Sequence, residues 1–125
     1  MSASEVTELL GRYDAAWNAQ DLDAIVAMHA PGMVFENHTA GARAEGDDVR
    51  GHIANIFENW PDMRFRGRKL QAREGLAVSE WTATATKLDG ERIEWDGVDI
   101  FEFEDGLIKR KGVYSSSATP RVLAQ

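Results

Sequence analysis

The chain has 125 residues, 43% of them hydrophobic, with no cysteine and a formal net charge of -7. Its length predicts one domain over 1–125 that buries its own core, and the missing cysteines exclude a disulfide scaffold, thiol catalysis and thiolate metal sites. The negative charge argues against nucleic acid or an anionic membrane as a partner, and no apolar run is long enough to span a bilayer. The first residues also lack a signal-peptide pattern, so we expect a soluble, cytoplasmic domain.

Two helices are predicted at the start of the chain. Ser2 and Glu5 have the spacing of a capping box, and apolar residues then recur at helical spacing over about three turns. These apolar residues are Val6, Leu9, Leu10, Tyr13 and Trp17. Asp21 is the expected N-cap of a short second helix, which Pro31 and Gly32 are expected to end.

The hydrophobic period changes in the second half of the chain. A short strand over 33–38 and a polar loop over 39–46 precede a third helix, which is expected from about Asp47 to the residue before Pro61. Apolar residues then alternate at the strand period of two. The expected strands cover roughly 63–72, 77–87, 91–104 and 107–114, with Asp-Gly turns after the second and third. The last residues, 115–125, are expected to form a loose tail or to pack on a neighbour.

Asp99 lies on what should be the apolar face of the third of these strands. At the strand period, one face carries Ile93, Trp95, Gly97, Asp99, Phe101 and Phe103. An ionised carboxylate there is costly to desolvate, so it needs a partner or stays protonated. A protonated acid in a pocket can donate a hydrogen bond to an oxygen that gains negative charge. The alternative is a bulge at Gly97 that turns Asp99 to water.

The order helix, helix, strand, helix and strand meander predicts an α+β fold with helices packed on a curved antiparallel sheet. In this order, and in the segments RYDAAWNAQDLDAIVAMHA, GMVFENH and WPD, the chain from Val6 to Tyr114 resembles the nuclear-transport-factor-2-like superfamily. Within it, the chain is similar to the SnoaL-like polyketide cyclases and the ketosteroid isomerases. The resemblance implies a strongly curved, mainly antiparallel sheet that forms a cone-shaped α+β barrel, closed over an apolar pocket by three N-terminal helices. It also implies a homodimer.

Two residues match the oxyanion hole of the ketosteroid isomerases. Tyr13 stands in the pattern RY-x-AA-x-N-A, where these enzymes have a helical tyrosine, and Asp99 stands in VDIF, which matches their strand motif for a protonated acid. The resemblance therefore implies isomerase, cyclase or dehydratase chemistry, without a cofactor, on a small hydrophobic molecule with a carbonyl or hydroxyl. Tyr13 and Asp99 would stabilise its enolate or phenolate.

The general base of the isomerases is missing. Asn37 occupies the position of their aspartate, and an amide cannot accept a proton at neutral pH. The SnoaL-like cyclases commonly have an acid in a Y-x-D motif, where this chain has Tyr114-Ser115-Ser116. His38 could serve as the base because imidazole titrates near neutrality, although strand alternation turns it away from Asn37. A water molecule held by Asn37 could also take this role, and so could a basic group of the substrate itself.

Large aromatic residues could form the wall of the pocket, although each of them could equally belong to the core. The expected pocket residues are Trp17, Phe35, Phe57, Trp60, Trp81, Trp95, Phe101 and Tyr114. The three histidines lack a compact ligand spacing, so no metal site is expected. Because the base is missing, the alternative function is a non-catalytic ligand-binding domain, or a dimerisation domain in which Tyr13 and Asp99 pair in the core.

Overall fold

The computed structural model describes residues 1–123, which form three helices and a curved sheet around a hydrophobic core. The helices are α1 (Ala3–Asn18), α2 (Leu22–Ala27) and α3 (Asp48–Asn59). Both expected N-caps are present: Ser2 and Glu5 exchange the two hydrogen bonds of a capping box, and the Asp21 carboxylate accepts a hydrogen bond from the backbone N–H of Ala24. The chemistry of the local chain therefore determines where α1 and α2 begin.

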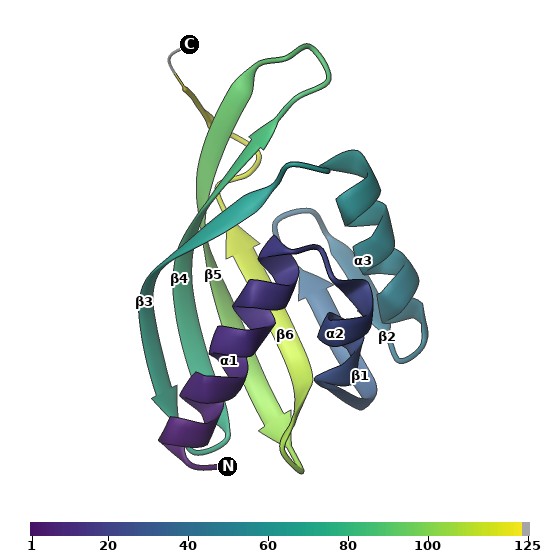
Figure 1. Cartoon of the computed structure of the whole chain (residues 1–125), viewed down its shortest axis with the longest axis vertical. Coiled ribbons are helices and arrows are strands. Elements are labelled where there is room, and N and C mark those ends of the chain that lie inside the picture. Colours follow the sequence, from purple (N-terminus) through teal and green to yellow (C-terminus); the bar gives the residue numbers. More distant parts are fainter. Residues whose placement is uncertain (124–125) are drawn as a thin grey trace.

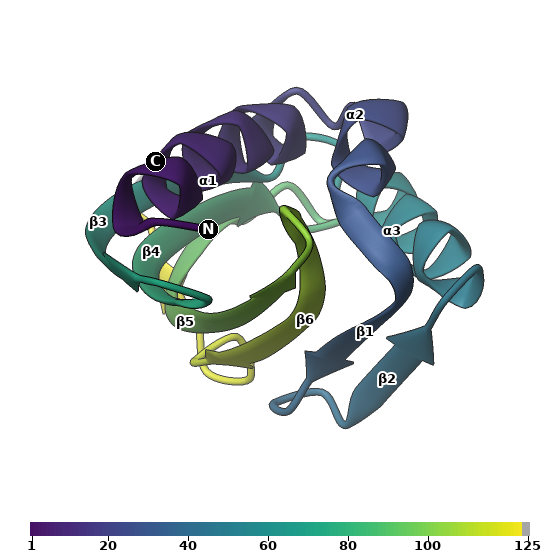
Figure 2. The same ribbon diagram turned by 90° about the horizontal axis from the view of Figure 1, so that it is seen from below.

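The sheet is strongly curved and mainly antiparallel. Its strands are β1 (His29–Asn37), β2 (Ala42–Glu45), β3 (Arg64–Arg73), β4 (Leu76–Thr86), β5 (Arg92–Glu104), β6 (Leu107–Ser115) and β7 (Arg121–Val122). The strand order is β2-β1-β6-β5-β4-β3, with β7 paired to β5, and β1 runs parallel to β6. Figures 1 and 2 show α1 lying across the inside of the curved sheet beside β3, while α2 and α3 stand on the β1 and β2 side. The sheet is an open cone, not a closed barrel.

The hairpin between β5 and β6 follows the turn chemistry expected from the sequence. Asp105 and Gly106 have φ angles of 52° and 79°. A type I′ turn requires positive φ at both central residues, which an Asp-Gly pair tolerates. This turn keeps β5 and β6 adjacent, and these two strands supply the ionisable groups of the site described below.

The structure corrects the expected course of the chain between α2 and α3. β1 begins at His29, so Pro31 and Gly32 lie inside an irregular strand and do not end the helix. The segment 42–45, which we expected in a loop, forms β2 because it pairs antiparallel with the end of β1. β2 is the polar second strand of a short hairpin with β1, and the start of β1 pairs with β6 far along the chain, so neither is marked by an apolar alternation.

The C-terminal segment is attached to the sheet as far as the structure describes it. Arg121 and Val122 pair with β5 as β7, and the Arg121 guanidinium contacts the carboxylates of Asp96 and Glu94. Residues 124 and 125 of the expected tail lie outside the described residues. Up to residue 123, the segment packs on its own domain.

One extra residue in β6 reverses the alternation of its side chains. Ile108 pairs with Phe103 and Arg110 pairs with Glu102, which leaves Lys109 without a cross-strand partner. Such a bulge puts two residues opposite one and shifts the side-chain parity of the strand beyond it. From 111 to 115, the odd-numbered residues of β6 face the concave side of the sheet.

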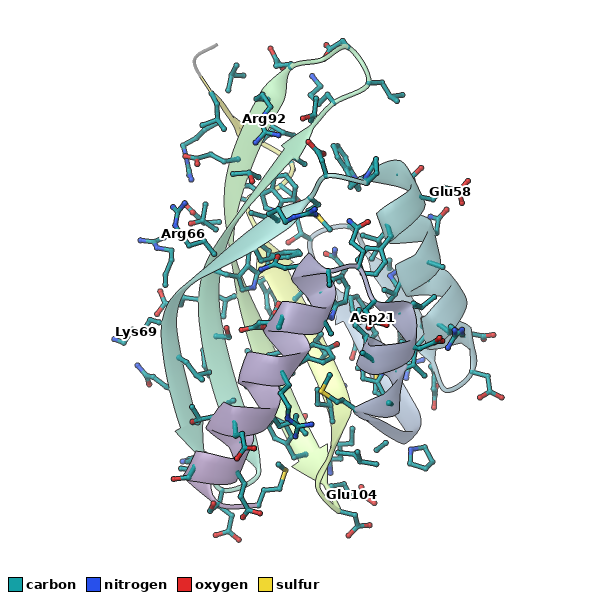
Figure 3. All side chains as sticks on the ribbon, viewed as in Figure 1. Asp21, Glu58, Arg66, Lys69, Arg92 and Glu104 are labelled. Atoms are coloured by element: carbon teal, nitrogen blue, oxygen red, sulfur yellow. The ribbon has the colours of Figure 1, made fainter. Side chains whose placement is uncertain are left out.

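The edge strand β3 is charged and largely exposed. Figure 3 shows Arg66 and Lys69 of β3 pointing away from the body of the protein. Charged side chains on an edge strand oppose pairing with the sheet of another molecule. The large aromatic residues Trp81 and Trp95 lie on the concave side of the sheet, where they are buried.

Candidate functional site

A cavity of about 360 Å³ opens between the concave face of the sheet, the end of α1 and α3. Small-molecule sites typically have volumes of about 300–1,000 Å³. The aromatic part of its wall consists of Trp17, Phe35, Trp60, Phe65, Trp81 and Trp95. The amides and hydroxyls of its wall belong to Asn37, Asn55, Asn59, Ser115 and Ser117. Asp99 and Lys111 are the two ionisable residues that line it.

Lys111 is a buried lysine among aromatic rings. Its side chain is 7% exposed, and Nζ lies 4.0 Å from the ring centroid of Trp17 and 5.1 Å from that of Phe35. Nζ is also 3.9 Å from Oδ2 of Asp99. Burial lowers the pKa of Lys111, while the negative charges of Asp99 and Asp14 act in the opposite direction.

Asp99 lies on the concave face of β5, as the strand period predicts. The residue is 8% exposed, and the pairing of β4 with β5 runs without interruption through Gly97, so the alternative of a bulge does not apply. Burial raises the pKa of Asp99, and the charge of Lys111 acts against this shift. Asp99 and Lys111 are therefore a buried acid and a buried base whose charges depend on one another.

A second cavity of about 40 Å³ lies on the α1 and β3 side of the same two residues. Trp17, Phe65, Trp81, Asp99 and Lys111 line both cavities and form the wall between them. Asp14 lines the smaller one: the residue as a whole is exposed, but desolvation of its carboxyl raises its pKa to about 6. Solvent contact weakens this effect.

Three buried polar atoms of residues in this wall lack a hydrogen-bond partner among residues 1–123. They are Nε1 of Trp17, Nε1 of Trp81 and Oδ1 of Asp99. The indole N–H of Trp81 lies near enough to Asp99 to oppose the rise of its pKa, yet without hydrogen-bond geometry. The indole N–H of Trp17 lies near the hydroxyl of Tyr13, a residue that lines neither cavity. Buried polar groups are usually satisfied, so the unpaired Trp81 N–H and Asp99 Oδ1 at one cavity wall indicate a place for a polar ligand atom.

Gly97 allows the Trp81 indole to lie flat against β5. The two residues are cross-strand partners, and a Cβ on Gly97 would stand 2.2 Å from Cζ2 of Trp81. No side chain larger than hydrogen fits at this distance. The glycine of the motif WDGVD thus determines the position of one wall of the cavity.

The structure places Tyr13 beside the cavities without lining either of them. Its hydroxyl is 3.0 Å from Nε2 of His29, and its ring packs edge-on against Phe101. Burial lowers the pKa of His29 to about 4, so its imidazole is neutral at pH 7. His29 thus orients the Tyr13 hydroxyl from β1.

Asn37 and His38 lie on different sides of β1. Asn37 lines the large cavity, and its Oδ1 accepts hydrogen bonds from the backbone N–H groups of Thr39 and Ala40. His38 stacks on the ring of Tyr114 at 4.3 Å and lies 3.9 Å from Glu36, away from the cavity lining. The structure therefore brings Asn37 to the cavity and keeps His38 from it.

Of the eight aromatic residues expected in the pocket, five line the cavity and three do not. Phe57 packs edge-on against Trp17 outside the cavity lining, and Phe101 is buried in the core. Tyr114 is half-exposed on the convex face of the sheet. Its placement is a correction with a clear cause, because the bulge at Lys109 reverses the parity that simple alternation assumes.

The same bulge explains why the sequence analysis missed Lys111. Unbroken alternation from Ile108 turns Lys111 to solvent, whereas the extra residue turns it inward, opposite Phe101. Asp14 was missed because it stands beside the apolar stripe of α1, where an acid usually faces water. The local motif KRKG contains no feature that separates the buried lysine from the exposed one.

Two kinds of feature are missing from the part of the chain that the structure describes. Within residues 1–123, no three His, Cys, Asp or Glu side chains are grouped closely enough to bind a metal ion. Over the same residues, no helix combines the length and the hydrophobicity needed to cross a bilayer.

Solved structures with similar folds cover most of the chain. A candidate SnoaL-like polyketide cyclase from Jannaschia sp. CCS1 superposes with a TM-score of 0.81 at 20% identity, covering 94% of this chain and 88% of the other. AclR, a candidate hydroxylase from Streptomyces galilaeus, gives 0.79 at 23% identity over 91% and 80% of the two chains. IdmH, a candidate polyketide cyclase from Streptomyces antibioticus, gives 0.79 at 19% identity over 90% and 93%. At these identities the likeness establishes the fold alone.

Comparison of sequences assigns the chain to a family. Among curated proteins, no sequence matches it. The family model for the SnoaL-like domain matches residues 10–111, from within α1 to Lys111 in β6. This match covers most of the domain and agrees with the open cone of the structure, with its helices on the concave side. The chain belongs to the family of SnoaL-like domains.

Proposed function

We propose that the protein is an isomerase- or cyclase-type enzyme that binds a flat, mostly apolar molecule with a carbonyl or acidic hydroxyl in the large cavity. The oxygen of the ligand would lie at the wall formed by Asp99 and Lys111, where charge develops as an enolate or phenolate. One observation carries this proposal: the buried acid Asp99 and the buried amine of Lys111 meet at a cavity wall where Oδ1 of Asp99 and Nε1 of Trp81 have no hydrogen-bond partner. A ligand oxygen there would satisfy a donor that otherwise remains unpaired in an apolar environment.

The electrostatics of the wall favour a negatively charged oxygen. The ammonium of Lys111 supplies a positive charge inside an apolar site, where a charge interacts more strongly than in water. Asp99 holds its proton more tightly than an exposed aspartate because burial raises its pKa, so it can donate a hydrogen bond. We therefore assign the role of the first donor to Asp99 and that of the second to Lys111, in place of Tyr13.

Proton transfer within this site would rely on carboxyl groups. The raised pKa of Asp14 lies closer to neutrality than that of an ordinary aspartate, which suits a group that both accepts and releases a proton. Asn37 would orient the ligand at the other end of the cavity, because its amide cannot take part in proton transfer. The solved relatives described as candidate polyketide cyclases support the same class of ligand.

The proposal is tested by titrating planar naphthols of graded acidity into the wild type and four variants. We expect tighter binding as the naphthol becomes more acidic, and a loss of about tenfold to a hundredfold in Asp99→Asn and Lys111→Met, the size expected for a charge-assisted hydrogen bond. Tyr13→Phe should retain affinity because the Tyr13 hydroxyl bonds to His29. Lys109→Met, on the exposed bulge, is the matched control.

Each contrary outcome has a defined meaning. If Tyr13→Phe loses as much affinity as Asp99→Asn, the ligand oxygen is bound by Tyr13 and Asp99, and the assignment of Lys111 in place of Tyr13 is wrong. If no naphthol binds the folded wild type, the proposal is wrong. Catalysis is separated from mere binding by hydrogen–deuterium exchange at the α-carbon of 2-tetralone, followed by NMR. Exchange no faster than in buffer, with naphthols still bound, would indicate the non-catalytic ligand-binding domain.

A further inference from the structure

The four lysines of the chain differ sharply in their surroundings. Lys69, Lys87 and Lys109 are exposed, and the last two contact carboxylates at the surface. Lys111 alone among them is buried, yet it borders both cavities and is therefore open to a ligand from the large one. A lysine that is both buried and reachable from a cavity is uncommon, because its charge must be desolvated.

Burial favours the neutral form of the Lys111 amine, whereas the faces of the surrounding aromatic rings and two nearby carboxyl groups favour the ammonium, and the net effect is a lowered pKa. Four aromatic rings, those of Tyr13, Trp17, Phe35 and Phe101, have centroids 4.0–5.8 Å from Nζ. Its charged neighbours are Asp99 on β5 and Asp14 on α1, and the pKa of both is raised, so each holds its proton more firmly than usual. The lowered pKa of Lys111 agrees with this environment. The ammonium form of Lys111 suits an enolate or phenolate, whereas the neutral form, whose share the lowered pKa increases, is the one that attacks a carbonyl with a protonated acid beside it.

We infer that Lys111 binds the carbonyl group of an aldehyde or ketone ligand covalently, as an imine, at the wall between the two cavities. This inference rests on the proposed function, since it uses the same cavity and the same orientation of the ligand oxygen. It adds a covalent step to the proposed activity and names the substrate class as carbonyl compounds with a flat apolar body.

The atoms of this step balance without a further reactant. Nζ of Lys111 attacks the carbonyl carbon, a C–N bond forms, and the electron pair of the C=O π bond moves to oxygen, which takes a proton from Asp99. The nitrogen then returns a proton to Asp99, which passes it to the hydroxyl, and the hydroxyl leaves as water while the nitrogen lone pair forms the C=N bond. The resulting iminium releases its remaining proton to the Asp99 carboxylate. Amine and carbonyl thus give imine and one water, and both hydrogens of the neutral amine leave in that water.

Two features of the site fit this sequence. Asp99 Oδ2 lies 3.9 Å from Nζ, close enough to exchange protons directly or through one water with groups on the reacting carbon. The small cavity of about 40 Å³ exceeds the roughly 10–15 Å³ that one water molecule requires, and it borders the same two residues. The water that is released can therefore leave the reacting atoms without passing the ligand in the large cavity.

The inference is tested by reductive trapping. The wild type is incubated at pH 7 with 2-naphthaldehyde and sodium cyanoborohydride, which reduces an imine to a stable secondary amine, and the modified lysines are identified by peptide mass spectrometry. We expect Lys111 to react at least about tenfold faster than each exposed lysine, because the cavity holds the aldehyde beside an amine whose pKa burial lowers. Asp99→Asn should slow the labelling of Lys111 and leave the labelling of the exposed lysines unchanged.

Matched variants make the result decisive. Lys111→Met should remove the fast labelling and Lys109→Met should leave it unchanged, with circular dichroism confirming that both are folded. If naphthols bind but Lys111 is labelled no faster than the exposed lysines, the imine is overturned and the proposed function stands. If naphthols do not bind and labelling is confined to the exposed lysines, both fail.

Discussion

At the scale of single residues, the site depends on a few polar groups held inside an apolar wall. Removing one member of a buried charged pair leaves the other without compensation, which is usually more damaging than replacing both. For Asp99 and Lys111 this means that Lys111→Met should leave Asp99 neutral, because the charge that opposed the rise in its pKa is gone. Asp99 and Lys111 are thus better understood as an acid and an amine whose pKa values are shifted by burial than as an ion pair that stabilises the fold.

Gly97 offers a direct test of how the cavity wall is positioned. Gly97→Ala would place a methyl group 2.2 Å from the Trp81 indole, so the ring must move or the strands must separate. We expect a loss of about 1–3 kcal/mol in the free energy of unfolding, typical of overpacking, together with weaker naphthol binding. Urea denaturation measures the first effect. Gly67→Ala, where a new Cβ meets nothing within 4 Å, is the control, and equal losses in both variants would contradict the explanation.

At the scale of elements, the bulge in β6 decides which residues form the site. Deleting Lys109 removes the extra residue and should either turn Lys111 and Val113 to the convex side or break the pairing of β5 with β6. In both cases we expect naphthol binding to fall below detection. Lys109→Ala keeps the number of residues and should bind like the wild type. Retained binding in the deletion variant, measured by the same titration, would show that the parity of β6 does not control the site.

Prediction from sequence succeeded where structure depends on neighbours in the chain. The caps at Ser2 and Asp21, the Asp-Gly turn and the concave position of Asp99 all follow from local patterns, and each is present in the structure. It failed where a partner strand decides. β2 is polar and becomes a strand by pairing with β1, and the inward turn of Lys111 comes from a bulge that leaves no mark in the composition of β6.

At the scale of the whole molecule, the buried His29 links folding stability to pH. Its pKa is lowered to about 4 in the folded state against an ordinary value of 6.5. Between these two values the unfolded chain binds more protons than the folded one, so stability contributed by His29 rises with pH and is lost as pH falls from 6.5 towards 4. Tyr13 and Lys111 are the polar and charged groups that face it.

His29→Gln should remove this dependence while keeping an acceptor for the Tyr13 hydroxyl. Between pH 7 and pH 5, we expect the wild type to lose about 1–2 kcal/mol more of its free energy of unfolding than the variant does. Urea denaturation at pH 5, 6 and 7 gives the comparison directly. Parallel curves for the two proteins would show that His29 is protonated equally in both states and that burial does not control its charge.

The wall between the cavities is formed by residues that are far apart in the sequence. Trp17 comes from α1 and Lys111 from β6, and β1 reaches β6 only through the parallel pairing of residues far apart in sequence. Such distant contacts form late in folding because they close the longest loops. The residues of the site extend from Asp14 to Ser117, so chemistry at Lys111 would begin only once β6 has paired with β1 and β5, and reactivity of this amine would report a folded molecule.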